Sequence, residues 1–101
     1  SALQNITNGA ATVHSIIVDN SLNTNDRSFL KLYDNLVDGG IDVDATEPDY
    51  VFVIDNAANR TISFPSGLTI ANGLSLRCVQ SGATSNIGDP TQNVSVTVIF
   101  S

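Results

Sequence analysis

Tryptophan and methionine are absent from this chain of 101 residues, and cysteine and histidine occur once each. A closed zinc site needs four ligands drawn mainly from Cys and His, so the sequence predicts no such metal site. The single cysteine, Cys78, cannot form an intramolecular disulfide, and its place in the strand-like run 74–80 predicts a buried thiol that packs as a small hydrophobic residue. Without tryptophan, only Tyr33 and Tyr50 offer rings that stack on sugars, which gives carbohydrate binding little support while leaving it open.

Charge is scarce as well, and most of it has one sign. Charged residues make up 14% of the chain, and ten acidic residues against four basic ones give a net charge of -6. Such a chain repels phosphate backbones and anionic lipid surfaces, so we expect neither nucleic acid nor membrane as a partner. No run approaches the roughly 18 apolar residues of a membrane span, and no signal-peptide pattern opens the sequence. We therefore expect synthesis in a cytoplasm, and the opening Ser1-Ala2-Leu3 fits the removal of an initiator methionine.

A catalytic set is hard to assemble from these residues. His14 would need a nucleophile, either Ser15 or a distant serine, and an acid that orients the imidazole. The sequence has no nucleophile-elbow pattern, so we interpret His14 as a solvent-facing or hydrogen-bonded strand residue. The glycine clusters at 38–40 and 82–88 lack the lysine of a phosphate-binding loop. We expect no catalytic residue, no cofactor and no enzymatic activity.

The acidic segment 38–49 is the candidate for a metal. Asp42, Asp44, Glu47 and Asp49 offer the hard oxygen ligands that calcium takes. The glycine that a calcium loop needs at its sharp turn is missing, and a proline interrupts the spacing. The sequence therefore predicts a solvated acidic loop and no metal site, with a weak calcium site shared between subunits left open.

Hydrophobic and polar residues alternate along much of the chain, which is typical of strands. The clearest run, 94–100, has four apolar residues on the face that belongs in a core, and Ser95, Thr97 and Ile99 on the other face. Further runs rich in β-branched and aromatic residues are 12–19, 29–34, 50–54, 60–64 and 74–80, with shorter candidates at 3–7 and 68–70. Residues 28–37 also show helical spacing, but the short run and its polar flanks favour a strand.

Turn residues separate these runs, and no amphipathic helix lies between them. The sequence therefore predicts an all-β fold: a single domain over 1–101, an antiparallel β-sandwich of six to eight strands, jelly-roll-like. We expect residues 1–9 to form an N-terminal arm that is free to add to a neighbouring sheet, so that its deletion leaves a folded domain that assembles less well. Pro48, Pro65 and Pro90 are expected at strand boundaries, where they block edge pairing.

Four segments together resemble small β-rich structural proteins of tailed bacteriophages. They are SIIVDN (15–20), FLKLYDN (29–35), ISFPSGLTIANGLSLRCV (62–79) and VSVTVIFS (94–101). Within the third segment, Phe64-Pro65-Ser66-Gly67 matches the "FP-G" turn of that group, and Ala71-Asn72-Gly73-Leu74 matches its "ATGL"-like strand. The resemblance covers most of the chain from Val13 onward.

The resemblance implies a non-enzymatic virion component, above all a head decoration or cement protein on the capsid surface. Its partners would be the major capsid protein and other copies of itself, so a homo-oligomer is expected. The exposure pattern makes Leu3, Ile6, Tyr50 and Ile99 the candidate protein contacts. The alternative is a tail or head-fibre module that binds a host receptor or glycan through loops 20–26 and 81–93.

Overall fold

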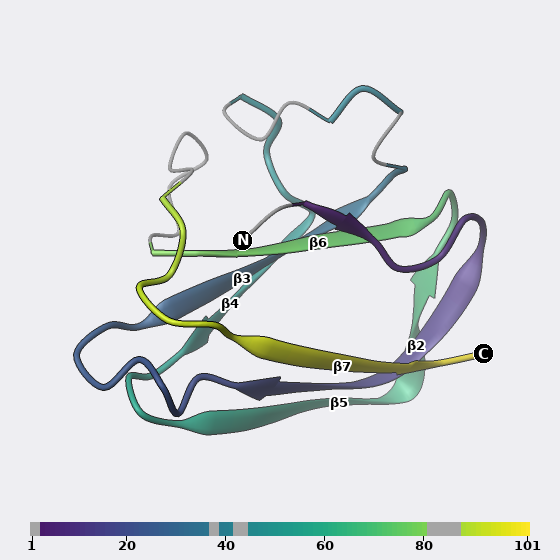
Figure 1. Cartoon of the computed structure of the whole chain (residues 1–101). Helices are drawn as coiled ribbons and strands as arrows, with labels where there is room; N and C mark the ends of the chain where they lie inside the picture. Colours follow the sequence, from purple (N-terminus) through teal and green to yellow (C-terminus); the bar gives the residue numbers. More distant parts are fainter. Residues whose placement is uncertain (1–2, 37–38, 42–44, 81–87) are drawn as a thin grey trace.

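The computed structural model describes residues 3–36, 39–41, 45–80 and 88–101, which form two antiparallel sheets packed face to face (Figure 1). The strands are β1 (Gln4–Asn5), β2 (Ala11–Asp19), β3 (Ser28–Asp34), β4 (Tyr50–Ile54), β5 (Asn59–Ile70), β6 (Leu74–Val79) and β7 (Ser95–Phe100). The four-stranded sheet has the order β1-β6-β3-β4, and the three-stranded sheet has the order β5-β2-β7. The predicted β-sandwich is confirmed, whereas this strand order does not show a jelly roll.

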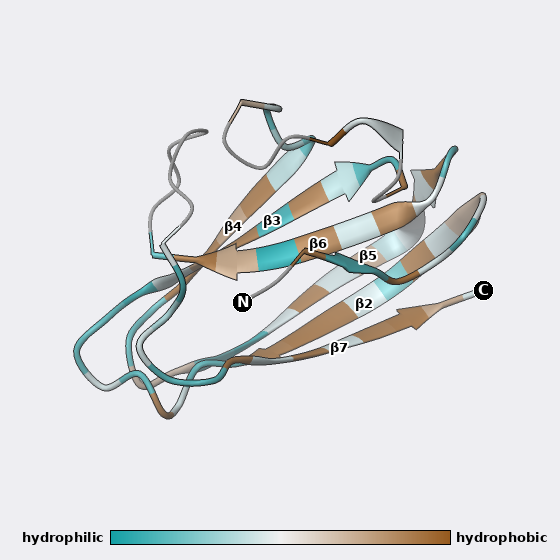
Figure 2. Cartoon of the chain, turned by 45° about the horizontal axis from the view of Figure 1, so that its top comes forward, coloured by the Kyte–Doolittle hydropathy of each residue, from teal (hydrophilic) through white to brown (hydrophobic). Residues whose placement is uncertain are grey.

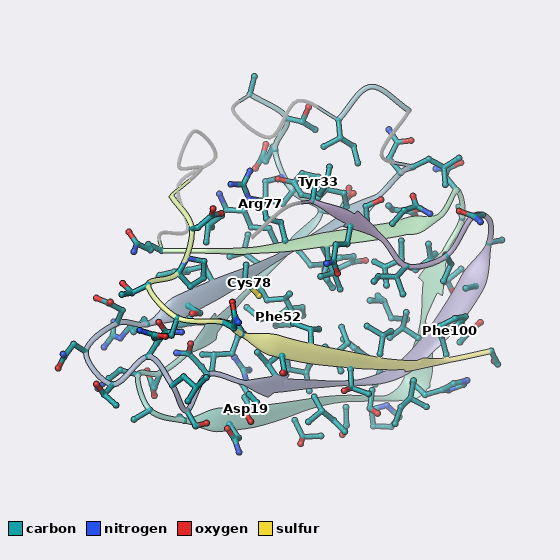
Figure 3. The ribbon with its side chains drawn as sticks, in the orientation of Figure 1. Asp19, Tyr33, Phe52, Arg77, Cys78 and Phe100 are labelled. Carbon is teal, nitrogen blue, oxygen red and sulfur yellow. The ribbon has the colours of Figure 1, made fainter. Side chains whose placement is uncertain are left out.

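The hydrophobic core lies between the two sheets and follows from the alternation of the strands. Every second residue points inward, so each strand contributes its apolar face to one layer of side chains. The buried cluster comprises Val13, Ile16, Val18, Leu30, Leu32, Ile54, Ile62, Ile70, Leu74, Leu76 and Cys78. Figure 3 shows Cys78 and Phe52 between the sheets, so the prediction that Cys78 is buried is confirmed. The Cα radius of gyration, 12.8 Å, is that of a compact domain of this length.

Strand β5 differs from the prediction. The sequence predicted two short strands separated by a turn at 65–67, but one twelve-residue strand runs through this segment. Ser63 pairs with Ser15 and Leu68 pairs with Val13, so residues 64–67 form a bulge opposite a single residue of β2. A proline is tolerated here because β5 is an edge strand, and Gly67 supplies the positive φ, +79°, that the bulge requires.

The N-terminal segment also differs from the prediction. Strand β1 pairs with β6, and the backbone N–H groups of Ile6 and Thr7 donate to the Leu74 carbonyl at 2.7 and 3.2 Å. The Leu74 N–H donates to Thr7 Oγ1 at 3.0 Å, and Thr7 is buried. The expectation of a free arm is therefore wrong for residues 3–7, which complete an edge of their own sheet. Residues 1 and 2 lie outside the described part of the chain.

Candidate functional site

The outer face of the three-stranded sheet is a flat array of small side chains, which we call the open face. Cross-strand pairs place three rows side by side, because each residue of β2 that points outward has a neighbour on β5 and another on β7. The rows are Ser63–Ser15–Ile99, Thr61–Ile17–Thr97 and Asn59–Asp19–Ser95. The predicted solvent-facing set of Ser95, Thr97 and Ile99 is confirmed, and all three are exposed.

Asp19 is the charged residue of the open face, and the remaining eight side chains are hydroxyls, an amide and two isoleucines. Ile17 and Ile99 are 39% and 49% exposed. Hydrogen bonds from Ser21, including its N–H at 2.9 Å from Oδ1, hold the pKa of Asp19 below its usual value. Sequence reasoning missed Ile17 because two isoleucines stand in a row in β2, and the hydropathy pattern does not show which one faces the core.

The outer face of the four-stranded sheet is different over β3 and β6, where it forms what we call the covered face. Its residues are Phe29, Lys31, Tyr33, Ser75, Arg77 and Val79, and the described residues 45–49 before β4 lie on this side of the sheet (Figure 1). Lys31 is only 1% exposed, so β3 is buried on both faces. Figure 3 shows Tyr33 and Arg77 on this side, away from Cys78.

Burial shifts the pKa values of polar groups on the covered face. Burial lowers the pKa of the Lys31 ammonium, and the neighbouring Arg77 guanidinium lowers it further. Burial raises the pKa of the Tyr33 phenol, whose hydroxyl has no hydrogen-bond partner in the described structure. Arg77 forms an ion pair with Asp89 at 3.3 Å. The Arg77–Asp89 ion pair joins β6 to the segment that leads into β7.

The four edge strands differ in how they are protected from pairing with another chain. At β4, Arg60 reaches across from β5, donates from Nη1 to the Val53 carbonyl at 2.8 Å, and lies 5.8 Å from the centre of the Phe52 ring. At β5, Pro65 and the bulge interrupt the edge. Strand β1 is only two residues long. Strand β7 has six residues without a proline or a charge, and Figure 2 shows it at the border of the molecule.

Two loops meet beyond the end of β2, where buried asparagines hold them together. Asn23 accepts a hydrogen bond from Gln92 N at 2.7 Å and donates to Gln92 O at 3.1 Å. Asn20 is fully buried and bonds the backbone carbonyls of Asp26 and Asp55 and the side chains of Asn23 and Ser28. A pocket of about 140 Å³ opens between the loops, lined by residues 22–26, Thr91 and Gln92.

His14 contacts a serine that is distant in the sequence, which is one of the two nucleophile positions considered above. Its Nε2 lies 2.9 Å from the Ser101 hydroxyl at the end of β7. Both side chains are exposed, and within the described residues no acid bonds the other imidazole nitrogen. His14 is therefore a hydrogen-bonded strand residue, as we interpreted it from the sequence.

The remaining candidate residues are scattered. Tyr50 and Ile99 are exposed but belong to different sheets, while Leu3 and Ile6 are half-buried and Ile6 packs against the core. In the acidic segment, Asp49 accepts a hydrogen bond from Asp34 N at 2.6 Å, and Glu47 is exposed.

Asp42 and Asp44, the other two predicted calcium ligands, lie outside the described residues. The part of the chain that is described contains no cluster of three His, Cys, Asp or Glu residues able to hold a metal.

Comparison with protein-family models, with curated proteins and with solved structures finds no match for this chain. Among the described residues, no helix is long and apolar enough to cross a membrane.

Proposed function

We propose that this chain is a non-enzymatic virion structural protein that decorates the head of a tailed bacteriophage and stabilises the capsid lattice. The observation that supports this proposal is the open face, which presents two exposed isoleucines among uncharged hydroxyl side chains. A face of this composition has a low desolvation cost, because few of its groups lose strong hydration when a protein surface covers them. The partners under this proposal are the major capsid protein and other copies of the chain.

Lattice binding also fits the distribution of charge. The net charge of -6 is distributed mostly outside the open face, which holds Asp19 alone. An oligomer that binds several equivalent lattice positions at once needs only modest affinity at each contact. The outer face of one three-stranded sheet is suited to such a contact, since it is smaller than a standard interface of about 800 Å² per partner.

The test is co-sedimentation of the purified protein with undecorated heads assembled from the major capsid protein of the phage that encodes it. We expect saturable binding at a fixed ratio, with an increase in the thermal resistance of the heads. Ile17→Asp on the open face should abolish binding, whereas Leu22→Asp, which adds the same charge at a loop residue that is 62% exposed, should leave it intact. Absence of saturable binding by the unmodified protein would refute the proposal.

A second candidate function is receptor or glycan binding by a tail or fibre module, and the loop pocket favours it. The Asn23–Gln92 pair brings together two of the loops predicted to meet such a ligand, around a small polar cavity. Under this alternative the effects of the two variants are reversed: Leu22→Asp, at the rim of the pocket, weakens adsorption to host cells, and Ile17→Asp does not.

A further inference from the structure

Strand β7 has a row of backbone groups that face away from its own sheet. Ser101 and Thr12 exchange two hydrogen bonds, from Ser101 N at 2.9 Å and from Thr12 N at 3.0 Å. Because the direction of N–H and C=O groups alternates along a strand, Val96, Val98 and Phe100 direct theirs toward the opposite side. Among the described residues, no strand pairs with that side. An unpaired edge of this length is a template for another strand.

The side chains around this edge are incompletely covered as well. Phe100 is 45% exposed although it lies on the core-facing side of β7, together with the half-buried Val96 and Val98. Ile99, on the open face, is also exposed. Strand β7 therefore has exposed apolar side chains beside its free backbone groups. Strand β4 also has exposed apolar side chains, at Tyr50, Val51 and Val53.

The distribution of charge favours a second copy of the chain as the partner of β7. Residues 90–101 contain no ionisable side chain, although the chain as a whole has a net charge of -6. Two copies approaching through an acidic surface repel each other, and β7 carries no charge. The longer edge strand, β5, carries Arg60 and is interrupted by its bulge. At β4, by contrast, Asp49 and Asp55 flank the strand, so that an antiparallel pair of copies would bring these carboxylates together.

We infer that β7 pairs antiparallel with β7 of a second copy about a two-fold axis, so that two three-stranded sheets become one continuous sheet of six strands. An antiparallel pair of identical strands is self-complementary, as a two-fold interface requires. The inference concerns the isolated chain and holds whether or not the protein decorates a capsid.

The register that uses all the outward-facing groups is centred on Val98. Val98 then faces Val98 of the second copy, and Val96 faces Phe100 of the second copy on each side of the axis. Each of these pairs exchanges two backbone hydrogen bonds, about six in total. Phe100 covers the opposing Val96, an aromatic and β-branched cross-strand pair that is favourable in sheets. The exposed face of the dimer is twice as wide, with the rows of hydroxyl and isoleucine side chains continuing across the axis.

The contact is small, so we expect a dissociation constant in the micromolar range. Sedimentation velocity of the full chain from about 5 μM to 1 mM covers both sides of such an equilibrium. The chain should shift from monomer to dimer as its concentration rises. Larger species should not form, because the pairing leaves β7 with no unpaired side.

Two matched variants test the edge. Thr97 on β7 and Thr61 on β5 are both exposed threonines of the open face, and both pair with Ile17. Thr97→Lys places two ammonium groups near the axis and should weaken dimerisation at least about tenfold, as edge lysines do. Thr61→Lys makes the same chemical change at the other edge and should leave the dissociation constant within about twofold of the original.

Two further measurements keep the inference testable if dimerisation is weak. Val98→Pro removes the central outward N–H, which an edge strand tolerates, and should give a folded monomer by circular dichroism. Amide hydrogen exchange at Val96, Val98 and Phe100 should be slower at high concentration, while exchange at Ile99, whose N–H faces β2, should not change. A chain that stays monomeric up to 1 mM, or one weakened equally by the two lysine variants, would overturn the inference.

Discussion

The outer faces of the two sheets differ in nearly every respect. The covered face of the four-stranded sheet holds two basic residues and a tyrosine, and Lys31, Tyr33 and Val79 on it are buried. The open face of the three-stranded sheet holds hydroxyl groups and two exposed isoleucines. The four-stranded sheet therefore has side chains packed on both faces over β3 and β6, whereas Val51 and Val53 on β4 and the open face of the three-stranded sheet remain exposed.

The edges follow the same division. The four-stranded sheet has β1, a short strand that continues into the docked residues 6–7, at one edge, and β4 with its Arg60 contact at the other. The three-stranded sheet has the bulged β5 and the regular, uncharged β7. An exposed regular edge promotes uncontrolled pairing unless a specific partner occupies it. The open face and the unprotected edge of β7 therefore belong to the same sheet.

The largest effect is expected from deleting residues 1–9. The deletion removes β1 and three hydrogen bonds to Leu74, so the edge of the four-stranded sheet becomes bare like that of the three-stranded sheet. At about 1 kcal/mol per hydrogen bond, the free energy of unfolding should fall by roughly 3 kcal/mol in urea titrations. Thr7→Val leaves the buried Leu74 N–H without its acceptor and the Gly9 carbonyl without the Thr7 hydroxyl, and should cost about 1–3 kcal/mol. A truncated chain as stable as the full chain would show that the first nine residues are an arm after all.

The second-largest effect is a loss of stability at high pH, caused by the thiol of Cys78 on the core side of the four-stranded sheet. Burial raises the pKa of the Cys78 thiol from 9.0 to about 11. Between these values the folded chain binds more protons than the unfolded chain, so its stability is complete below pH 9 and falls as the pH rises toward 11, by roughly 2–3 kcal/mol. Urea unfolding at several pH values should show this loss, and Cys78→Ala should lack it. Tyr33 and Lys31 titrate in both proteins, so the difference between the two curves isolates the thiol.

A direct comparison of the two outer faces comes from alanine substitutions. Val79 on the covered face is fully buried, and Ile17 on the open face is 39% exposed. Val79→Ala leaves a cavity and should lower the free energy of unfolding by about 1–3 kcal/mol, whereas Ile17→Ala should cost less than about 1 kcal/mol despite losing more atoms. Equal costs for the two variants would mean that the covered face is not a second packed layer.

The sequence predicted most strands because alternation with period two survives wherever one face is solvated. The run 94–100 and the strands β2, β4 and β6 were predicted nearly to the residue. Strand β5 was divided because Pro65 and Gly67 are local turn signals, and only the strand order shows that they lie on an edge where a bulge accommodates them. Local pattern therefore identifies strands, but their interruption depends on long-range pairing.

The candidate sites depend even more on long-range pairing. The open face required knowing that Thr61 and Thr97 lie on either side of Ile17, although they are 36 residues apart in the chain. The Asn23–Gln92 pair and the Arg60 contact with β4 have no sequence signal at all. Ile99 was identified because its strand alternates cleanly.

The smallest effect is expected at the Tyr33 hydroxyl, which is buried on the covered face without a hydrogen-bond partner in the described structure. A buried hydroxyl without a partner loses its hydration and gains nothing in return, so Tyr33→Phe should leave stability unchanged or raise it by up to about 1 kcal/mol. Urea unfolding of both proteins measures the difference, with Tyr50→Phe at an exposed phenol as the control. A loss of more than 1 kcal/mol would show that the Tyr33 hydroxyl is hydrogen-bonded in solution, and that the covered face contains a polar network rather than packed side chains.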